Sequence, residues 1–430
     1  MGRGFRPAGR AERGQSGPAV QPIAPKWTLP TASGSVTPMQ LRTTALQAAL
    51  ADEAVDGWLF YDFRGSDPIG RRILGLGDRM ATRRWFYCVP ADGEPRGLVS
   101  AVEAGALHGL PGAMRVYHTW EELQSGLAAI LSGLRRVAMQ YSPRAEVPSV
   151  SLVDAGTVEL VRASGVEVCS SADLVQRVEA VWSGEQYASH ARAARVVRGL
   201  VDAAFAEIAA RCRAGRPAGE GDIQRFLLDG FAAQGLVTHH PPIVAADAHS
   251  ADPHFETPAS GGAPLSAGTF VLIDLWAKEP AGVYADITWT GFVGDNVPAR
   301  HAAIFEVVRR ARDAGVAAVR DGIAAGASLR GCDLDRVVRG VIDAAGYGAQ
   351  FVHRTGHSIG VDVHGTGANI DGFETPDTRR LLSGTCFSIE PGIYLTGEFG
   401  VRSELNVFVD GEKAVVTGEP VQTAVVPILG

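Results

Sequence analysis

FVLIDLWA at residues 270–277 and VYADITWT at residues 283–290 are two apolar, β-prone runs separated by the short stretch KEPAG. Such runs on both sides of a Pro/Gly loop are typical of a β-hairpin. Each run carries one carboxylate, and a loop centred on Pro280 would place Asp274 and Asp286 directly opposite each other. Opposed residues have Cβ atoms roughly 5 Å apart, so one carboxylate would have to hold a proton. A bound cation would remove this conflict.

A second pair of runs repeats the arrangement. FSIEPGIY at residues 387–394 and VRSELNVFV at residues 401–409 flank a turn around Gly397 and place Glu390 and Glu404 in a similar relation. The register of both hairpins is inferred, and a slip of one residue would turn these side chains to opposite faces. A single acidic residue on a strand is ordinarily a solvated charge. Two matched pairs in strands rich in Val, Ile, Leu and Phe favour a shared metal site.

Histidines upstream of and between the hairpins are candidate functional residues, with His357 the candidate metal ligand. His254 precedes the first hairpin, and FVHRTGHSIGVDVH at residues 351–364 contains His353, His357 and His364. The spacing differs from that of a zincin helix, because a glycine interrupts it and no glutamate follows the first histidine. Imidazole beside carboxylates suits Mn, Co, Zn or Fe better than Mg or Ca. Four further histidines are interpreted as ordinary core or surface residues: His239, His240, His249 and His301.

The composition is that of an ordinary globular protein. The chain has 430 residues, of which 46% are hydrophobic and 20% charged, and a net charge of −7. Its length favours two domains, and its charge gives no reason to expect a nucleic acid or an anionic membrane as partner. No apolar run approaches the roughly 18 residues of a membrane-spanning helix. Five scattered cysteines without a Cys-x-x-Cys arrangement favour a reducing cytoplasm over a disulfide or zinc framework.

The predicted elements divide the chain into three parts. Residues 1–38, rich in Gly, Pro and Arg, are predicted to be a disordered tail. Residues 39–176 alternate strands and helices, which favours an α/β domain with a mixed sheet. The predicted strands there are residues 57–62, 85–89, 97–100, 137–141 and 166–169. Residues 177–430 are predicted to form the catalytic domain, in which each hairpin follows a pair of helices, an order that suggests internal duplication. These helices are predicted at residues 185–213, 222–234, 299–322 and 333–346.

Residues from about 180 to 420 resemble the pita-bread (creatinase/aminopeptidase) metallopeptidase family, in its aminopeptidase P and prolidase branch. The motifs that carry this resemblance are Ile-Asp at 273–274, Tyr-Ala-Asp-Ile-Thr at 284–288, Thr-Gly-His at 355–357 with His364 seven residues on, Glu-Pro-Gly-Ile-Tyr at 390–394, and Gly-Val-Arg-Ser-Glu at 400–404. Together these motifs are highly specific. The resemblance implies a creatinase-like α/β domain followed by a pita-bread α+β catalytic domain.

The resemblance also implies a set of metal ligands. Two divalent metal ions are implied, with Mn expected first and Co or Zn as alternatives. The ligands would be Asp274, Asp286, His357, Glu390 and Glu404. Asp274 would bind one ion, while Asp286 and Glu404 would bridge both. His357 and Glu390 would complete the second ion's coordination. Two such ions would lower the pKa of a shared water and supply the nucleophile.

The remaining candidates would act on the substrate. Glu390 would also relay a proton towards the leaving nitrogen. His254 and His364 would bind the scissile carbonyl and its developing oxyanion. The positions that in this branch line the site for the proline ring and the carboxylate side of the substrate are His353, Tyr394 and Arg402.

The implied function is therefore a dimetal exopeptidase that hydrolyses Xaa-Pro bonds at the N-terminus of peptides, of aminopeptidase P or prolidase type. A cytoplasmic homodimer acting on peptides with proline in the second position is expected. Two alternatives stay open: a non-peptide C–N hydrolase of creatinase type, and a non-catalytic pita-bread binding protein. The presence of all five ligands argues against both.

Three features depart from the family pattern. The interval between Asp274 and Asp286 is one residue longer than usual. Trp289 stands where the family has arginine, and Arg354 and Ser358 stand where it has glycine. Because Arg354 and Ser358 flank the predicted pocket, these departures bear on substrate preference.

Overall fold

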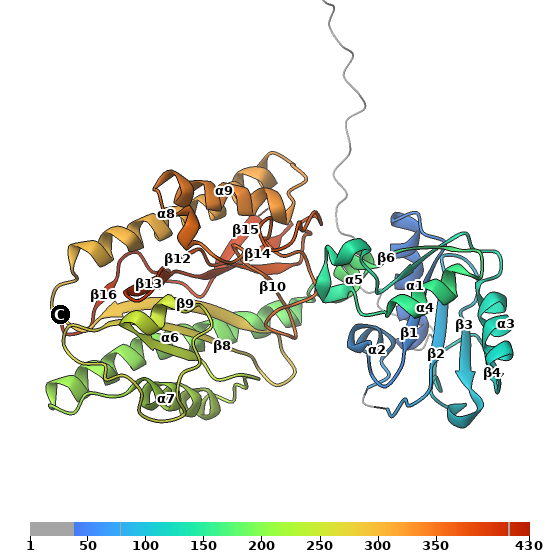
Figure 1. Ribbon diagram of the computed structural model, residues 1–430, viewed down its shortest axis with the longest axis horizontal. Coiled ribbons are helices and arrows are strands. Elements are labelled where there is room, and N and C mark those ends of the chain that lie inside the picture. Colours follow the sequence, from blue (N-terminus) through green and yellow to red (C-terminus); the bar gives the residue numbers. More distant parts are fainter. Residues whose placement is uncertain (1–37, 78, 412) are drawn as a thin grey trace, which may run out of the picture.

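The computed structural model describes residues 38–430 apart from residues 78 and 412. The predicted disordered tail, residues 1–38, lies outside this part of the chain except for its last residue. Figure 1 shows two lobes that meet near α5 (Ala172–Val175), with the described chain before α5 in one and most of the chain after it in the other. Among the helices of the described residues, none has the length and apolarity needed to cross a membrane.

The first lobe is built on a six-stranded mixed sheet in the order β4-β3-β2-β1-β5-β6. Its strands are β1 (Gly57–Asp62), β2 (Trp85–Pro90), β3 (Arg96–Ser100), β4 (Ala113–Tyr117), β5 (Arg136–Met139) and β6 (Glu167–Ser170). Its helices besides α5 are α1 (Pro38–Asp52), α2 (Pro68–Leu74), α3 (Trp120–Leu131) and α4 (Ala155–Arg162). The sequence predicts the mixed sheet and five of these strands but misses β4. Four of the five β4 residues are exposed at the sheet edge, so this strand has no buried apolar run to reveal it.

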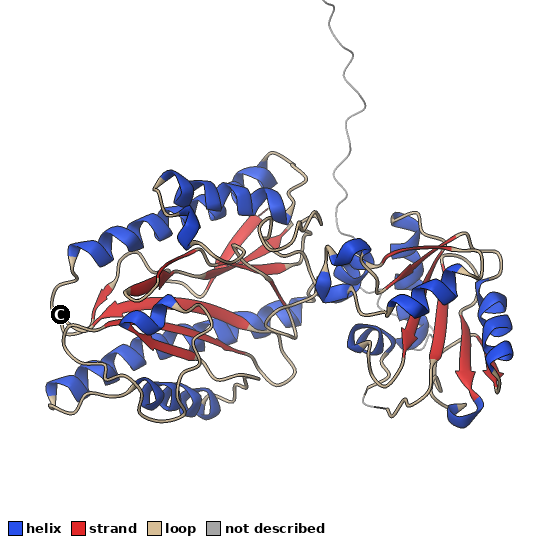
Figure 2. Ribbon diagram, viewed as in Figure 1, coloured by secondary structure: helices blue, strands red, loops and turns tan. Residues whose placement is uncertain are grey.

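The second lobe contains three sheets enclosed by two pairs of helices (Figure 2). The sheets have the orders β16-β9-β8-β7, β10-β11-β14-β15 and β12-β13. The strands are β7 (Ile243–Ala246), β8 (Phe270–Ala277), β9 (Ala285–Phe292), β10 (Ser358–Ile359), β11 (Cys386–Ile389), β12 (Gly392–Leu395), β13 (Phe399–Arg402), β14 (Leu405–Asp410), β15 (Lys413–Thr417) and β16 (Val426–Pro427). The helices are α6 (Gly184–Arg213), α7 (Glu220–Ala233), α8 (Ala299–Ala324) and α9 (Gly331–Ala344).

The order of elements repeats in this lobe, as the sequence suggests. Helices α6 and α7 share one hydrophobic core with β7, β8 and β9. Helices α8 and α9 pack in the same way against β11 and β14. The two helix pairs therefore lie on opposite outer sides, with the sheets between them (Figure 1). The strands of both hairpins that carry the candidate ligands belong to this central layer.

The register of the first hairpin differs from the prediction. Asp274 pairs with Thr288, and Asp286 pairs with Trp276, so the two carboxylates are diagonal neighbours rather than directly opposed. The turn is centred one position later than Pro280, which shifts the pairing by two residues. Because side chains alternate with a period of two, this even shift keeps Asp274 and Asp286 on the same face.

The second hairpin has the predicted register, with one interruption. Gly392 pairs with Arg402 and Ile389 pairs with Leu405, and both pairs are symmetric about Gly397. Gly397 has a φ of 80°, a conformation that favours glycine at the turn. Between these pairs each predicted strand breaks into two, which separates β11 from β12 and β13 from β14. The break frees the backbone N–H of Glu390 to donate to the Thr355 carbonyl at 2.8 Å.

A side-chain amide joins the two hairpin sheets. Asn406 on β14 accepts a hydrogen bond from the backbone N–H of Asp286 at 3.0 Å and donates one to the Asp286 carbonyl at 2.7 Å. The backbone N–H of Glu404 donates to the Thr288 carbonyl at 3.3 Å nearby. These bonds set β9 against β14, and with them the carboxylates that each strand carries.

His190 ties α6 to the same layer from the other side. Its imidazole is buried and lies 2.6 Å from the Tyr284 carbonyl oxygen through Nδ1 and 2.7 Å from Thr417 Oγ1 through Nε2. Burial lowers the pKa of His190 from 6.5 to about 4. Folding therefore favours the neutral imidazole.

We expect this buried histidine to make stability depend on pH. Because its folded pKa lies below its unfolded value, its contribution is complete above pH 6.5 and is lost as the pH falls towards 4. The loss should reach about 3 kcal/mol. Urea unfolding of wild type and His190→Gln at several pH values measures it, since the difference between the two free energies should shrink by this amount on acidification. His118→Gln, at an exposed position, serves as the control, and parallel behaviour of both variants would contradict the assignment.

Candidate metal centre

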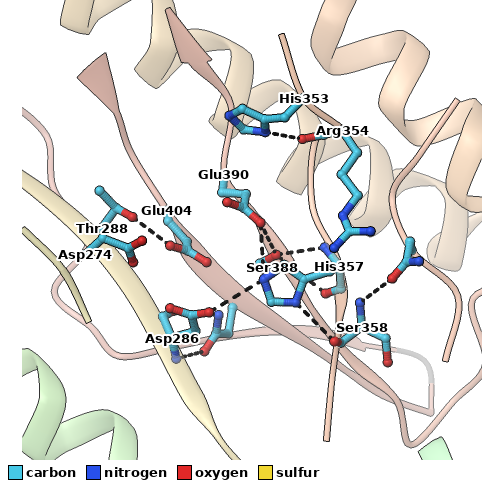
Figure 3. Close-up of polar contacts among 12 residues, drawn as sticks. Asp274, Asp286, Thr288, His353, Arg354, His357, Ser358, Ser388, Glu390 and Glu404 are labelled. Atoms are coloured by element: carbon cyan, nitrogen blue, oxygen red, sulfur yellow. Dashed lines mark hydrogen bonds and ion pairs between the residues drawn. The ribbon is translucent and has the colours of Figure 1, made fainter. Parts of the chain in front are cut away.

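The five predicted ligands come together between the two hairpins (Figure 3). They line one cavity of about 810 Å³. Asp274 lies in β8 and Asp286 in β9. The other three flank strand ends of the second sheet: His357 directly precedes β10, Glu390 directly follows β11 and Glu404 directly precedes β14. Nε2 of His357 lies 3.3 Å from Glu390 Oε1 and 3.6 Å from Asp286 Oδ2. One ligand atom each of Asp286, His357 and Glu404 lies within 4.8 Å of the other two.

Three carboxylate oxygens at this centre are buried without a hydrogen-bond partner among the described residues. They are Asp274 Oδ1, Asp286 Oδ1 and Glu404 Oε1. Burial raises the pKa of all three carboxyls, and the neighbouring carboxylates raise those of Asp286 and Glu404 further. A buried acceptor without a partner costs free energy, and a buried anion costs more. Divalent cations would satisfy these oxygens and cancel the repulsion, so the residues present fit a metal site.

The imidazole predicted to be a ligand is neutral and oriented for this role. Burial lowers the pKa of His357 to about 3, so the ring is uncharged at neutral pH. Its Nδ1 lies 3.1 Å from the Ser358 carbonyl oxygen, which leaves Nε2 towards the carboxylates. A metal-binding histidine commonly has its second nitrogen bonded in this way.

Hydroxyl groups that sequence reasoning missed hold the carboxylate ligands. Thr288 Oγ1 donates to Glu404 Oε2 at 2.8 Å, and Ser388 Oγ donates to Glu390 Oε1 at 3.0 Å. The signal for Thr288 was available, because it lies two residues after Asp286 and therefore on the same face of the strand. Single serines and threonines are too common in strands to stand out otherwise.

The three residues predicted to line the proline site form one hydrogen-bonded chain. Arg402 lines the cavity, pairs with Asp274 Oδ2 and donates to Thr288 Oγ1 at 3.0 Å. It also donates to the Tyr394 hydroxyl at 3.1 Å, and that hydroxyl lies 2.7 Å from His353 Nε2. Tyr394 and His353 thus stand behind Arg402 rather than among the cavity-lining residues.

His254 and His364 both line the cavity, as predicted for groups that meet the substrate. The ring of His364 lies 4.3 Å from that of His357 in an edge-on contact. The neighbouring His357 and burial lower the pKa of His364 to about 2. His364 is therefore a neutral ring, able to donate one hydrogen bond into the cavity.

Two of the four histidines interpreted as ordinary residues also line this cavity. His239 and His240 form one wall, with ring centroids 4.6 Å apart. The interpretation holds for the others. His249 lies 2.7 Å from a Glu220 oxygen, and His301 stacks on Phe399. The sequence positions of these four histidines do not distinguish the two that line the cavity from the two that do not.

Comparisons with known proteins agree with this centre. The family model of metallopeptidase family M24 matches residues 192–411. The chain is 32% identical over 210 residues to a probable dipeptidase PepE of Mycobacterium tuberculosis, covering 49% of this chain and 52% of that protein. It is 36% identical over 188 residues to an Xaa-Pro dipeptidase of Lactobacillus helveticus, covering 44% of this chain and 46% of that protein. The chain thus spans about half the length of the curated relatives it matches.

Solved structures match over nearly the whole chain. The dipeptidase PepE of Mycobacterium ulcerans has a TM-score of 0.67 at 26% identity, covering 90% of this chain and 97% of that chain. The prolidase of Pyrococcus horikoshii has a TM-score of 0.60 at 18% identity, covering 89% and 99%, and supports the pita-bread fold alone. With the family model matching half of its residues, including all five predicted ligands, this chain belongs to metallopeptidase family M24.

Proposed function

We propose that this protein is a metal-dependent exopeptidase that hydrolyses Xaa-Pro bonds at the N-terminus of peptides. The observation that carries the proposal is the set of buried, unpaired carboxylate oxygens beside a neutral imidazole. Relatives named Xaa-Pro dipeptidase and Xaa-Pro aminopeptidase support the substrate class. Two divalent ions, with Mn preferred over Co or Zn, would be held by Asp274, Asp286, His357, Glu390 and Glu404.

The hydrogen bonds support different parts for these ligands. Asp274 already has Oδ2 paired with Arg402, so only Oδ1 is free, as suits a ligand of one ion. Asp286 has no side-chain hydrogen-bond donor among the described residues, which suits a bridging carboxylate. Glu404 is proposed as the second bridge. Glu390 lies next to His357 and would complete the second ion's coordination with it.

When bound, the two ions would supply Lewis acidity and lower the pKa of a water molecule. Glu390, with one oxygen fixed by Ser388, would accept a proton and pass it to the leaving nitrogen. His254 and the uncharged ring of His364 would each donate a hydrogen bond to the carbonyl oxygen as negative charge develops there. An imide bond to proline offers no N–H. We assign recognition of the proline side of the substrate to Arg402, with Tyr394 and His353 holding its guanidinium in place.

The domain division, the cellular location and the oligomeric state are proposals as well. Residues 177–430 would form the catalytic domain and residues 39–176 a separate N-terminal domain. All five cysteines are free thiols, which fits a cytoplasmic location. We propose a homodimer because the resembling branch implies one.

The direct test is hydrolysis by metal-stripped protein supplied with Mn²⁺, Co²⁺ or Zn²⁺. Alanine should be released from Ala-Pro and Ala-Pro-Ala but not from Ala-Ala-Ala. Chelation should abolish release, because the nucleophile depends on the ions. Undiminished activity in chelator would overturn the metal mechanism. Equal release from Ala-Ala-Ala would overturn the proline requirement, and failure on all three peptides would leave the creatinase-type alternative.

A second test separates catalysis from stability at the bridging ligands. Asp286→Asn and Glu404→Gln keep the side-chain shape but remove a buried charge, so each should abolish turnover. Each should also stabilise the metal-free protein, because burial and the neighbouring carboxylates raise the pKa of both groups and folding therefore disfavours their ionised form. Urea unfolding in chelator and peptide assays with Mn²⁺ measure the two effects. Asp321→Asn, at an exposed position on α8, should change neither. Near-normal activity of either variant would contradict its bridging role.

A further inference from the structure

The loop that carries His364, residues 360–368, has no regular secondary structure. One side of it is attached to the catalytic lobe. The backbone N–H of Tyr284 donates to the Gly360 carbonyl at 2.9 Å, and Lys278 Nζ donates to the Val361 carbonyl at 2.6 Å. Both accepting carbonyls belong to residues that come before His364 in the chain. After His364, the Gly365 N–H donates to the Ser358 carbonyl at 2.6 Å, and Arg379 donates to the Thr366 and Gly367 carbonyls at 2.8 and 2.7 Å, all within this lobe. A second attachment comes from outside it.

Gln176 supplies that second attachment. It begins η4 (Gln176–Ala180), directly after α5, and is 1% exposed. Its Oε1 accepts a hydrogen bond from the Ala368 backbone N–H at 2.6 Å, and its Nε2 donates to the Arg380 carbonyl at 2.9 Å. The Gln176 amide therefore forms a hydrogen bond at each end of the segment 368–380, which begins four residues after His364.

The position of Gln176 is set by the N-terminal lobe. The preceding α5 residues Ala172, Leu174 and Val175 are buried in the hydrophobic core of its sheet. The loop also approaches η4 closely, because a Cβ added to Gly367 would lie 3.1 Å from Ala180 Cβ. A shift of α5 would therefore move the loop that carries His364, because Gln176 and Ala180 both contact this loop directly.

A second contact between the lobes is weaker. Arg72 Nη1 lies 3.4 Å from Asp362 Oδ2, but the two side chains are 36% and 60% exposed. Exposed ion pairs contribute little to stability, because water screens them. A buried amide bonded at both ends is costlier to lose, because its partners stay buried and unpaired. Of these two contacts between the lobes, the one made by Gln176 is therefore the stronger.

We propose that Gln176 is a positioning residue for His364, so that the N-terminal lobe holds part of the catalytic apparatus of its own chain. This inference rests on the proposed function, in which His364 binds the developing oxyanion. Gln176 does not reach the cavity itself. Its effect would pass along residues 364–368 to the imidazole.

The test is Gln176→Met, which keeps the length of the side chain and removes both hydrogen bonds. We expect kcat on Ala-Pro to fall about ten- to a hundredfold with little change in KM, as misplaced catalytic groups produce. Hydrogen exchange of the metal-free protein should rise in peptides covering residues 360–370. Co²⁺ titration should show unchanged metal binding, because His364 is not a proposed ligand. Gln176→Glu should recover kcat at low pH, where its protonated carboxyl can accept and donate as the amide does.

Gln47→Met is the matched control. Gln47 also donates from its amide to backbone carbonyls, those of Pro90 and Gly93, but lies within the N-terminal lobe. It should leave kcat and loop exchange unchanged. Equal effects of Gln176→Met and Gln47→Met, or lost Co²⁺ binding in the former, would overturn the proposal. If wild type fails on every Xaa-Pro peptide, the proposed function fails, while the exchange experiment still decides whether Gln176 holds the loop.

Discussion

The burial of several carboxylates facing one another is the constraint on which the rest of the second lobe depends. Three of their oxygens have no partner among the described residues, and the one guanidinium that pairs with them, Arg402, reaches Asp274. A single cationic side chain cannot neutralise the group. The surrounding strands must therefore supply enough packing free energy to hold like charges together until cations bind. Asp274 and Asp286 accordingly lie within buried strands, while Glu390 and Glu404 lie directly beside the ends of β11 and β14.

The two sheets meet this requirement through a few polar contacts between apolar strands. Asn406 bonds to both backbone groups of Asp286, which fixes β14 against β9. On the helix side, the buried Arg312 donates from Nη1 to Ser403 Oγ at 2.6 Å and to the Gln422 carbonyl at 2.9 Å. Ser403 lies at the break between β13 and β14, next to Glu404. The break that aims Glu404 into the cavity is thus held by hydrogen bonds from α8.

Much of this arrangement is readable from the sequence because it follows periodic rules. Apolar alternation located both ligand hairpins, and an error of two residues in the register of the first left Asp274 and Asp286 on the correct face. The features that the sequence did not predict follow no periodic pattern of side chains. Strand β4 is an exposed edge, and Ser388 and Asn406 reveal their roles only when a second strand lies beside them. His239 and His240 fall between elements, so their place on the cavity depends on how the chain turns before β7.

The departures from the family pattern differ in what they can affect. Trp289 points away from Thr288 and Asp286. The Arg198 guanidinium from α6 lies 3.7 Å from the centroid of the Trp289 ring. A positive charge therefore lies beside β9 on its helix side, although Trp289 replaces the family's arginine. Ser358 turns its hydroxyl to the Gly367 backbone N–H at 3.0 Å, which adds a contact within the His364 loop. Arg354 is different, because its charge contributes to lowering the pKa of both His357 and His364. Of the three substituted positions, Arg354 alone brings a new charge near the reacting groups, so selectivity among peptides should depend on it more than on Trp289 or Ser358.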